Sequence, residues 1–121
     1  MKKLKVGIIG CGRVAQHYKI IFNKYLKSKF KVIAVADLNI EKANILGDFF
    51  KCKSYKSLIE LSNNERPDLI IISTPSGDHF KSIKLSLTLG YNTVTEKPMA
   101  MTPKQCEILI KISKKNNLFF N

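Results

Sequence analysis

The residues with the most distinctive chemistry lie in the stretch Gly10-Cys11-Gly12-Arg13-Val14-Ala15, near the start of the chain. Its small residues at positions 10, 12 and 15 follow the G-x-G-x-x-G/A spacing of turns that hold the pyrophosphate of a dinucleotide. The first glycine allows a tight bend, the second lets the backbone approach the phosphates, and the third small residue lets helix and strand pack closely. A helix that starts here also favours an anion through its free N–H groups. So short a pattern also arises by chance in glycine-rich turns, so other residues must distinguish the two interpretations.

A carboxylate, Asp37, ends the next apolar run at 31–37. In a dinucleotide-binding fold an acidic residue at this point accepts hydrogen bonds from the ribose hydroxyls and repels the 2′-phosphate of NADP. We therefore predict NAD as the cofactor, with NADP possible because Lys42 lies nearby. The alternative is that Asp37 only starts the turn before a helix capped by Asn39.

A polar loop, residues 73–79, follows the most apolar run of the chain at 68–72. Ligands of open α/β sheets lie outside the carboxyl ends of the strands, so this loop is expected to face the same crevice as the glycine turn. Ser73 and Thr74 could donate hydrogen bonds to the cofactor, and Pro75 would stiffen the loop. His79 opens the next helix, either as a residue of the cofactor site or as a capping or surface residue.

Glu96-Lys97-Pro98 follows a further strand-like run at 91–95 and is expected at the same edge of the sheet. Lys97 is the ionisable side chain that could donate a proton or hydrogen bond to a substrate hydroxyl or carbonyl. Burial beside a cofactor would lower its pKa toward a useful range, whereas Glu96 would hold it charged. The alternative is an exposed Glu–Lys pair at a turn.

The segments that must position these groups alternate between strand and helix patterns. The runs 31–37 and 68–72 lack strict alternation, which is typical of parallel strands covered on both faces. Helices are expected at about 13–27, 40–50, 79–89 and 102–116, with a short strand at 52–55, a short helix at 57–61 and a last strand from 118. The first helix is predicted to bury one stripe, made by Val14, Tyr18, Ile21, Phe22 and Tyr25. We predict one α/β domain over residues 1–121, a doubly wound Rossmann sheet of about six parallel strands with helices on both faces.

Composition excludes several classes of protein. The chain has 121 residues, a formal net charge of +12 and 45% hydrophobic residues, so a folded domain is expected. No apolar run reaches the length of a membrane span and no signal peptide is evident, which predicts a cytoplasmic protein without a membrane partner. The lysines are scattered and only two arginines occur, which argues against a nucleic-acid partner. Cys11, Cys52 and Cys106 form no C-x-x-C pair, so we expect buried, reduced thiols and no metal site.

With the glycine turn, Asp37, TPSGDH and VTEKPMAMT in this order, the whole chain resembles the N-terminal half of the Gfo/Idh/MocA oxidoreductases. Within the family, the motif TEKPMA is most similar in sequence to that of the dehydrogenases that oxidise the 3-hydroxyl of UDP-N-acetyl-hexosamines or their uronates. The resemblance implies NAD(P)-dependent hydride transfer at a sugar or nucleotide-sugar hydroxyl. It implies that Lys97 assists proton movement and that the cofactor contacts Gly10, Gly12, Arg13, Val14, Asp37, Ser73, Thr74, Pro75, His79 and Glu96.

Members of this family carry a second domain that holds most substrate contacts and usually the oligomer interface, and the sequence contains no counterpart of it. We therefore expect a truncated chain that binds NAD without turning over sugar, because hydride transfer needs a substrate held close to the nicotinamide. A longer form would be a homo-oligomeric sugar dehydrogenase. The alternative is a stand-alone NAD-sensing or adaptor module without catalysis.

Overall fold

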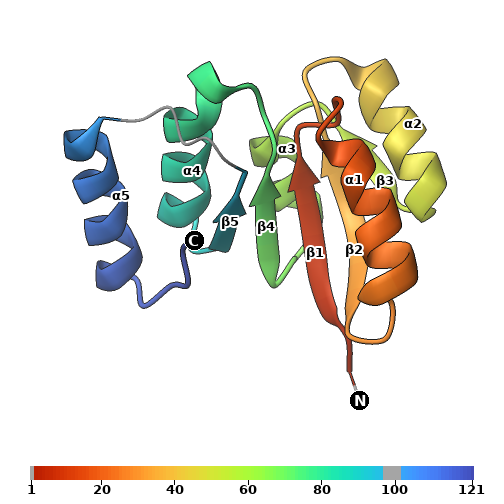
Figure 1. Cartoon of the computed structure of the whole chain (residues 1–121), viewed down its shortest axis with the longest axis horizontal. Helices are drawn as coiled ribbons and strands as arrows, with labels where there is room; N and C mark the ends of the chain where they lie inside the picture. Colours follow the sequence, from red (N-terminus) through yellow and green to blue (C-terminus); the bar gives the residue numbers. More distant parts are fainter. Residues whose placement is uncertain (1, 97–101) are drawn as a thin grey trace.

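The computed structural model describes residues 2–96 and 102–121, and within them five parallel strands form one sheet in the order β3-β2-β1-β4-β5 (Figure 1). The strands are β1 (Leu4–Ile9), β2 (Phe30–Ala36), β3 (Lys53–Tyr55), β4 (Leu69–Ile72) and β5 (Asn92–Thr95). The chain moves from β1 to β2 on one side and later to β4 on the other. This reversal at β1 is the point where open sheets of this kind bind their ligands.

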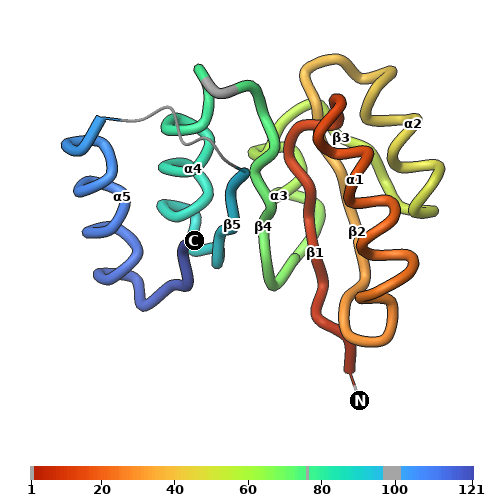
Figure 2. The backbone as a smooth tube through the Cα atoms, viewed as in Figure 1, coloured from red at the N-terminus to blue at the C-terminus, as the bar shows by residue number. Residues whose placement is uncertain are grey.

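Helices cover both faces of the sheet, as predicted. They are α1 (Ala15–Ile20), the π-helix η1 (Ile21–Tyr25), α2 (Ile40–Phe50), α3 (Leu58–Asn64), the 3₁₀ turn η2 (Ser76–Asp78), α4 (His79–Thr88) and α5 (Pro103–Lys115). In Figure 2 the trace passes from α1 and α2 beside β2 to α4 and α5 beside β5. No helix in the described parts of the chain is long and apolar enough to cross a membrane.

Side-chain caps explain where two helices begin, and the cap predicted at Asn39 is confirmed. The Asn39 side chain accepts hydrogen bonds from the backbone of Glu41 and Lys42 at the start of α2. Thr102 and Gln105 form a reciprocal capping box at the start of α5, with Pro103 as the first helical residue. Both caps satisfy N–H groups that the helix itself leaves unpaired.

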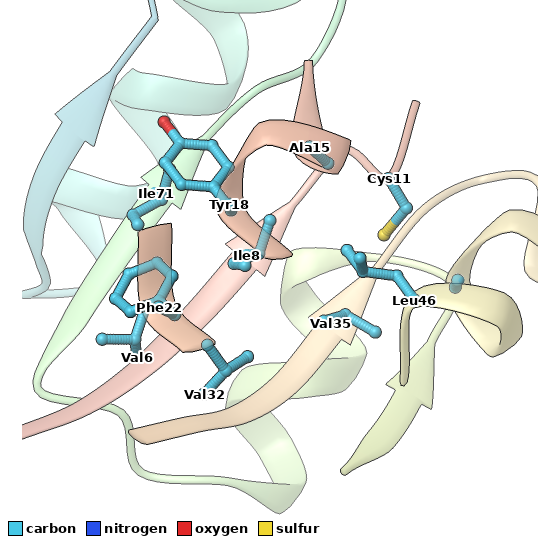
Figure 3. Close-up of a cluster of buried hydrophobic side chains, with 11 residues drawn as sticks. Val6, Ile8, Cys11, Ala15, Tyr18, Phe22, Val32, Val35, Leu46 and Ile71 are labelled. Carbon is cyan, nitrogen blue, oxygen red and sulfur yellow. The ribbon is translucent and has the colours of Figure 1, made fainter. Parts of the chain in front are cut away.

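Two apolar clusters fill the space between the sheet and its helices. The first unites β1 and β2 with α1, η1 and α2 and is shown in Figure 3, where the rings of Tyr18 and Phe22 lie over the strand residues Val6 and Ile8. The second lies on the opposite face, where α3, α4 and α5 bury Leu61, Ile83 and Leu109. Burial on both faces accounts for the uninterrupted apolar runs 6–9 in β1, 32–36 in β2 and 69–72 in β4.

An extra residue in β2 explains why its sequence does not alternate. Val6 pairs with Val32, but Gly7 pairs with Ala34, so Ile33 has no partner of its own in β1. Val32 and Val35 therefore both face the first cluster, whereas Ala34 faces the second. Such a bulge shifts the side-chain period by one residue, and strict alternation would have assigned half of this strand to the wrong face.

The first predicted helix is only partly right. Tyr18 and Phe22 are buried, but Val14 and Ile21 are exposed and Tyr25 is 68% exposed. For Ile21 and Tyr25 the reason is that α1 changes to the wider π-helix after Ile20, with the Leu26 N–H bonded to the Ile21 carbonyl. The i→i+5 spacing of that segment breaks the 3.6-residue period on which the predicted stripe depended. Val14 precedes α1 and lines the cleft instead.

The predicted last strand is present as a short continuation of the sheet. Phe120 forms a parallel bridge with Thr93, and the Thr95 N–H donates to the Asn121 carbonyl at 2.9 Å. The end of the chain therefore lies beside β5, as Figure 2 shows.

The predicted cysteine burial is right for Cys11 and wrong for Cys52 and Cys106, which are half-buried, although all three are free.

A pair of hydroxyl groups joins α4 to β5 inside the second cluster. Ser86 and Thr93 are both fully buried, and their hydroxyl oxygens lie 2.8 Å apart. The Thr93 hydroxyl also donates to the Tyr91 carbonyl at 2.9 Å, so the Ser86 hydroxyl is the donor to Thr93. Each buried hydroxyl thus has a partner, as burial of a polar group requires.

Gly47 lies inside α2, and we expect its replacement by alanine to destabilise the protein. A Cβ atom there would lie 2.5 Å from Ser54 Oγ and 3.1 Å from the Cys52 carbonyl oxygen. Ser54 would have to rotate and give up its bond to the Ala43 carbonyl. We expect a loss of about 1–2 kcal/mol in the free energy of unfolding from overpacking, despite a helix-propensity gain of about 1 kcal/mol. Urea unfolding followed by circular dichroism measures this, and Gly47→Ala/Ser54→Ala should recover part of the loss. Increased stability of the single variant would contradict it.

Candidate functional site

The predicted site residues lie directly beyond the ends of four neighbouring strands, and the sheet itself positions them. The Gly10 N–H donates to the Ala36 carbonyl at 2.8 Å, and the Ser73 N–H donates to the Ile9 carbonyl at 2.8 Å. In the same way the Glu96 N–H donates to the Ile72 carbonyl at 3.2 Å. Each of these bonds holds the first residue after one strand against the last residue of the neighbouring strand.

The glycine turn has the geometry that its sequence predicts at positions 10 and 15. Gly10 has φ +97°, and a Cβ atom there would lie 2.6 Å from backbone atoms of Ser73 and Thr74. Ala15 is fully buried between the turn and β1. A Cβ at Gly12 would meet no atom of the described chain within 4 Å, so this residue leaves open space on the cleft side of the turn.

Asp37 connects the end of β2 to the glycine turn. One carboxylate oxygen accepts the Cys11 N–H at 2.7 Å, and the other accepts the Asn39 N–H at 2.8 Å. Asp37 therefore shapes the turn before α2, as the alternative interpretation held, and also fixes the turn that follows β1. A carboxylate has about four lone-pair positions, so each oxygen retains acceptor capacity for a further donor.

The four strand ends enclose one cleft of about 830 Å³. This volume lies within the range of about 300–1,000 Å³ common for small-molecule sites. Every described residue predicted to contact a cofactor lines it: Gly10, Gly12, Arg13, Val14, Asp37, Ser73, Thr74, Pro75, His79 and Glu96. Lys97, the predicted catalytic residue, lies outside the described residues. The fold therefore brings together ten predicted contact residues from segments that are far apart in the chain.

Two residues that line this cleft each have a buried polar atom without a partner among the described residues. His79 is 3% exposed, so it is not a surface residue, and its Nδ1 atom has no hydrogen bond among the described residues. Thr74 Oγ1 is likewise buried and unpaired within the described chain. Buried polar atoms are normally paired, and both of these atoms belong to residues that line the cleft. The Ser73 hydroxyl, by contrast, donates to the Gly10 carbonyl at 2.7 Å and supports the turn.

Tyr18 is a core residue, as the sequence pattern indicated, and it also contacts a residue that lines the cleft. Its hydroxyl donates to Glu96 Oε1, which joins α1 to the residue after β5. Burial, together with this bond to the Glu96 carboxylate, raises the pKa of Tyr18 above its ordinary value. The one feature of the sequence that indicated a contact of this kind is a tyrosine, with its hydroxyl group, at a position in an otherwise apolar helix stripe.

Cys11 lies within the glycine turn, but its thiol is held inward. Its Sγ atom lies 3.3 Å from the Ala36 carbonyl oxygen. Burial, reinforced by the negative charge of Asp37, raises the pKa of the Cys11 thiol to about 12. A thiol that stays protonated is a poor nucleophile, so Cys11 packs against the strands as a small apolar side chain.

Several other cleft residues were not identified from the sequence. Leu38 follows Asp37 and is 88% exposed, and Lys56 borders the same end of the cleft as Lys42, which the sequence had singled out. On the other side, the first turns of α4 contribute Lys81, Ser82 and Leu85. These residues have no distinctive spacing, and only the path of the folded chain places them at the cleft.

Comparison with known proteins shows a clear family relationship. The model of the Gfo/Idh/MocA family, described as an oxidoreductase family with an NAD-binding Rossmann fold, matches residues 4–121. D-xylose 1-dehydrogenase (NADP(+)) of Hypocrea jecorina is 27% identical over 96% of this chain and 32% of its own length. D-glucoside 3-dehydrogenase of Escherichia coli is 27% identical over 93% of this chain and 32% of its own length. The chain therefore spans about a third of these relatives.

Solved structures share the fold. The WlbA dehydrogenase of Chromobacterium violaceum, solved with NADH and UDP-GlcNAcA, superposes with a TM-score of 0.93 at 23% identity. The match covers 99% of this chain and 34% of that one. The myo-inositol dehydrogenase of Lactobacillus casei, solved with NAD(H) and myo-inositol, gives a TM-score of 0.83 at 23% identity over 94% of this chain and 34% of that one.

Proposed function

The chain belongs to the Gfo/Idh/MocA oxidoreductase family as its NAD-binding Rossmann domain, and from this premise we propose how its cleft holds the cofactor and which reaction it serves. The observation that carries the proposal is the convergence of four strand ends on one cleft, with ten predicted contact residues in its wall. The adenosine half lies toward β2, where Asp37 retains acceptor capacity for the ribose hydroxyls. The pyrophosphate lies over the glycine turn, and the nicotinamide half lies toward β4 and β5.

The hydrogen-bonding groups of the cleft support this orientation. The bonds of the described residues provide no acceptor for the backbone N–H groups of Gly12 and Arg13, which suits them to phosphate oxygens. On the β4 side, where the nicotinamide and its ribose present polar groups, Thr74 Oγ1 and His79 Nδ1 have no partner among the described residues. Arg13 is exposed at the mouth of the cleft and adds positive charge beside the phosphates.

The reaction we propose is hydride transfer at a sugar or nucleotide-sugar hydroxyl. The bound nicotinamide supplies the hydride acceptor, and Lys97 supplies the group that takes up or returns the hydroxyl proton. Support for a carbohydrate substrate comes from the relatives, whose names include a xylose and a glucoside dehydrogenase. Support for a nucleotide-sugar substrate comes from the sequence motif TEKPMA and from the fold shared with the WlbA dehydrogenases.

Turnover requires more than this domain. The chain spans about a third of its relatives' length, and we propose that the residues that hold the substrate belong to the remaining two thirds. The domain alone is then expected to bind the cofactor without oxidising sugar. Continuation of the reading frame into a substrate domain would support the enzyme, and a natural stop after Asn121 would support a stand-alone NAD-binding module. Either outcome leaves the cofactor site as described.

Calorimetry with both cofactors tests the proposed orientation. We expect NAD to bind more tightly than NADP, because the 2′-phosphate would lie against the Asp37 carboxylate. Asp37→Ala should weaken NAD binding and remove the preference, whereas Asp48→Ala, which removes an exposed carboxylate of α2 outside the cleft, should change neither. NAD should also raise the thermal midpoint, since a ligand that binds only the native state stabilises it. Equal affinities in the unmodified protein would disprove the role of Asp37, and binding of neither cofactor would disprove the site.

A further inference from the structure

The contact between Tyr18 and Glu96 places a fixed carboxylate in the wall of the cleft. Tyr18 is 8% exposed and comes from α1, whereas Glu96 follows β5, so the bond joins residues 78 positions apart. In Figure 3 the Tyr18 hydroxyl oxygen points away from the apolar side chains of the first cluster. The Glu96 N–H bond to the Ile72 carbonyl holds the backbone of the same residue. Glu96 is thus held at two points beside the cleft.

Tyr18 is the hydrogen-bond donor in this contact, and the Glu96 carboxylate is the acceptor. Tyr18 remains the donor at neutral pH because burial and the nearby carboxylate both oppose loss of its proton. The charge is also only half exposed, so solvent screens it less than a carboxylate on the open surface.

The other charged residues of the cleft lie elsewhere or face solvent. Among the described residues, the remaining carboxylates that line it are Asp37, at the adenosine side, and Asp78, which is exposed at the start of α4. The cationic residues that line it are exposed as well: Arg13, Lys42, Lys56 and Lys81. Among the described residues that line the cleft, Glu96 is therefore the half-buried charge on the β5 side.

We propose that Glu96, held by Tyr18, makes the cleft discriminate between the two redox states of its cofactor in favour of NAD⁺. The inference rests on the proposed function, which places the nicotinamide half toward β4 and β5. The nicotinamide ring carries a positive charge in NAD⁺ and none in NADH, while the rest of the two molecules is the same. A carboxylate near the ring therefore attracts only the oxidised form, whereas every other contact serves both forms equally. The site would thereby favour substrate oxidation and the release of NADH.

The test compares dissociation constants for NAD⁺ and NADH in the full chain and in single variants. We expect Glu96→Gln to lower the affinity for NAD⁺ relative to NADH by about tenfold, the effect of one opposite charge a few ångströms away. Tyr18→Phe keeps the buried ring but removes the donor, and should shift the ratio in the same direction by a smaller factor. Asp37→Asn is the matched control, because it removes a cleft carboxylate at the adenosine side and should weaken both forms by the same factor.

The outcomes separate this inference from the proposed function. Failure of the unmodified chain to bind either form would overturn the proposed function and the inference together. If both forms bind and Glu96→Gln leaves their ratio unchanged, the cofactor site stands and the redox discrimination is wrong. If Glu96→Gln shifts the ratio while a folded Tyr18→Phe does not, as judged by its thermal unfolding, the charge of Glu96 discriminates without Tyr18 and that part of the inference is wrong.

Discussion

Replacing Gly10 with alanine is expected to abolish NAD binding and to lower the free energy of unfolding by about 3 kcal/mol or more. Two effects add at this position. The backbone has φ +97°, and the new Cβ would lie 2.6 Å from backbone atoms of Ser73 and Thr74, which cannot rotate away as a flexible side chain can. The turn would move off the end of β4, and its bonds to Ala36 and Ser73 would be lost.

Gly90 offers a matched control for the steric part of this effect. It has a similar φ of +92°, but a Cβ there would meet no described atom within 4 Å. Gly90→Ala should therefore cost only the backbone term of about 1–2 kcal/mol and leave NAD binding intact. Urea unfolding and calorimetry on both variants measure the difference. If Gly10→Ala proved no more costly than Gly90→Ala, contact with the β4 loop would not be what requires glycine at position 10.

Replacing Lys97 with methionine is expected to reduce kcat by about 100-fold or more in a longer protein that carries a substrate domain. Oxidation of a hydroxyl releases a proton, and the side chain that receives it must lie where the hydride leaves. Lys97 directly follows Glu96, which lines the cleft after β5. Methionine keeps much of the length of the lysine side chain but removes the amine.

The readouts for Lys97 separate chemistry from binding. The dissociation constant for NAD should stay nearly unchanged in Lys97→Met, because the cofactor contacts come from other residues. Lys104→Met is the control, since Lys104 is an exposed lysine in the first turn of α5 and does not line the cleft. Turnover that persists in Lys97→Met, or falls equally in Lys104→Met, would refute a catalytic role for Lys97.

Those parts of the fold that depend on local sequence were predictable. The caps at Asn39 and Thr102 follow from side chains that bond within three residues, and the strand at 69–72 follows from an uninterrupted apolar run. The cleft was predictable for a different reason. Parallel strands present their carboxyl ends at one edge, so a polar residue after each of several strands predicts one shared site without knowledge of the exact packing.

What could not be predicted depends on contacts between distant residues. The contact of Tyr18 with Glu96 joins positions 78 residues apart, and no local period encodes it. The unpaired Ile33 in β2 reflects register against β1, and the π-helix that exposes Tyr25 breaks the period that a helix prediction assumes. Gly47 illustrates the same limit, because the sequence shows only its cost to the helix while the structure shows Ser54 where a side chain would be.

The buried hydroxyl pair of Ser86 and Thr93 has a consequence for how this domain can diverge over evolutionary time. If Thr93 mutates to valine first, the Ser86 hydroxyl loses its acceptor in a buried site, an intermediate that selection would remove. If Ser86 mutates to alanine first, the Thr93 hydroxyl still donates to the Tyr91 carbonyl. An apolar contact between α4 and β5 can therefore evolve only if Ser86 is replaced before Thr93. Descendants of this sequence should combine alanine at position 86 with an unchanged Thr93 far more often than they combine an unchanged Ser86 with valine at position 93.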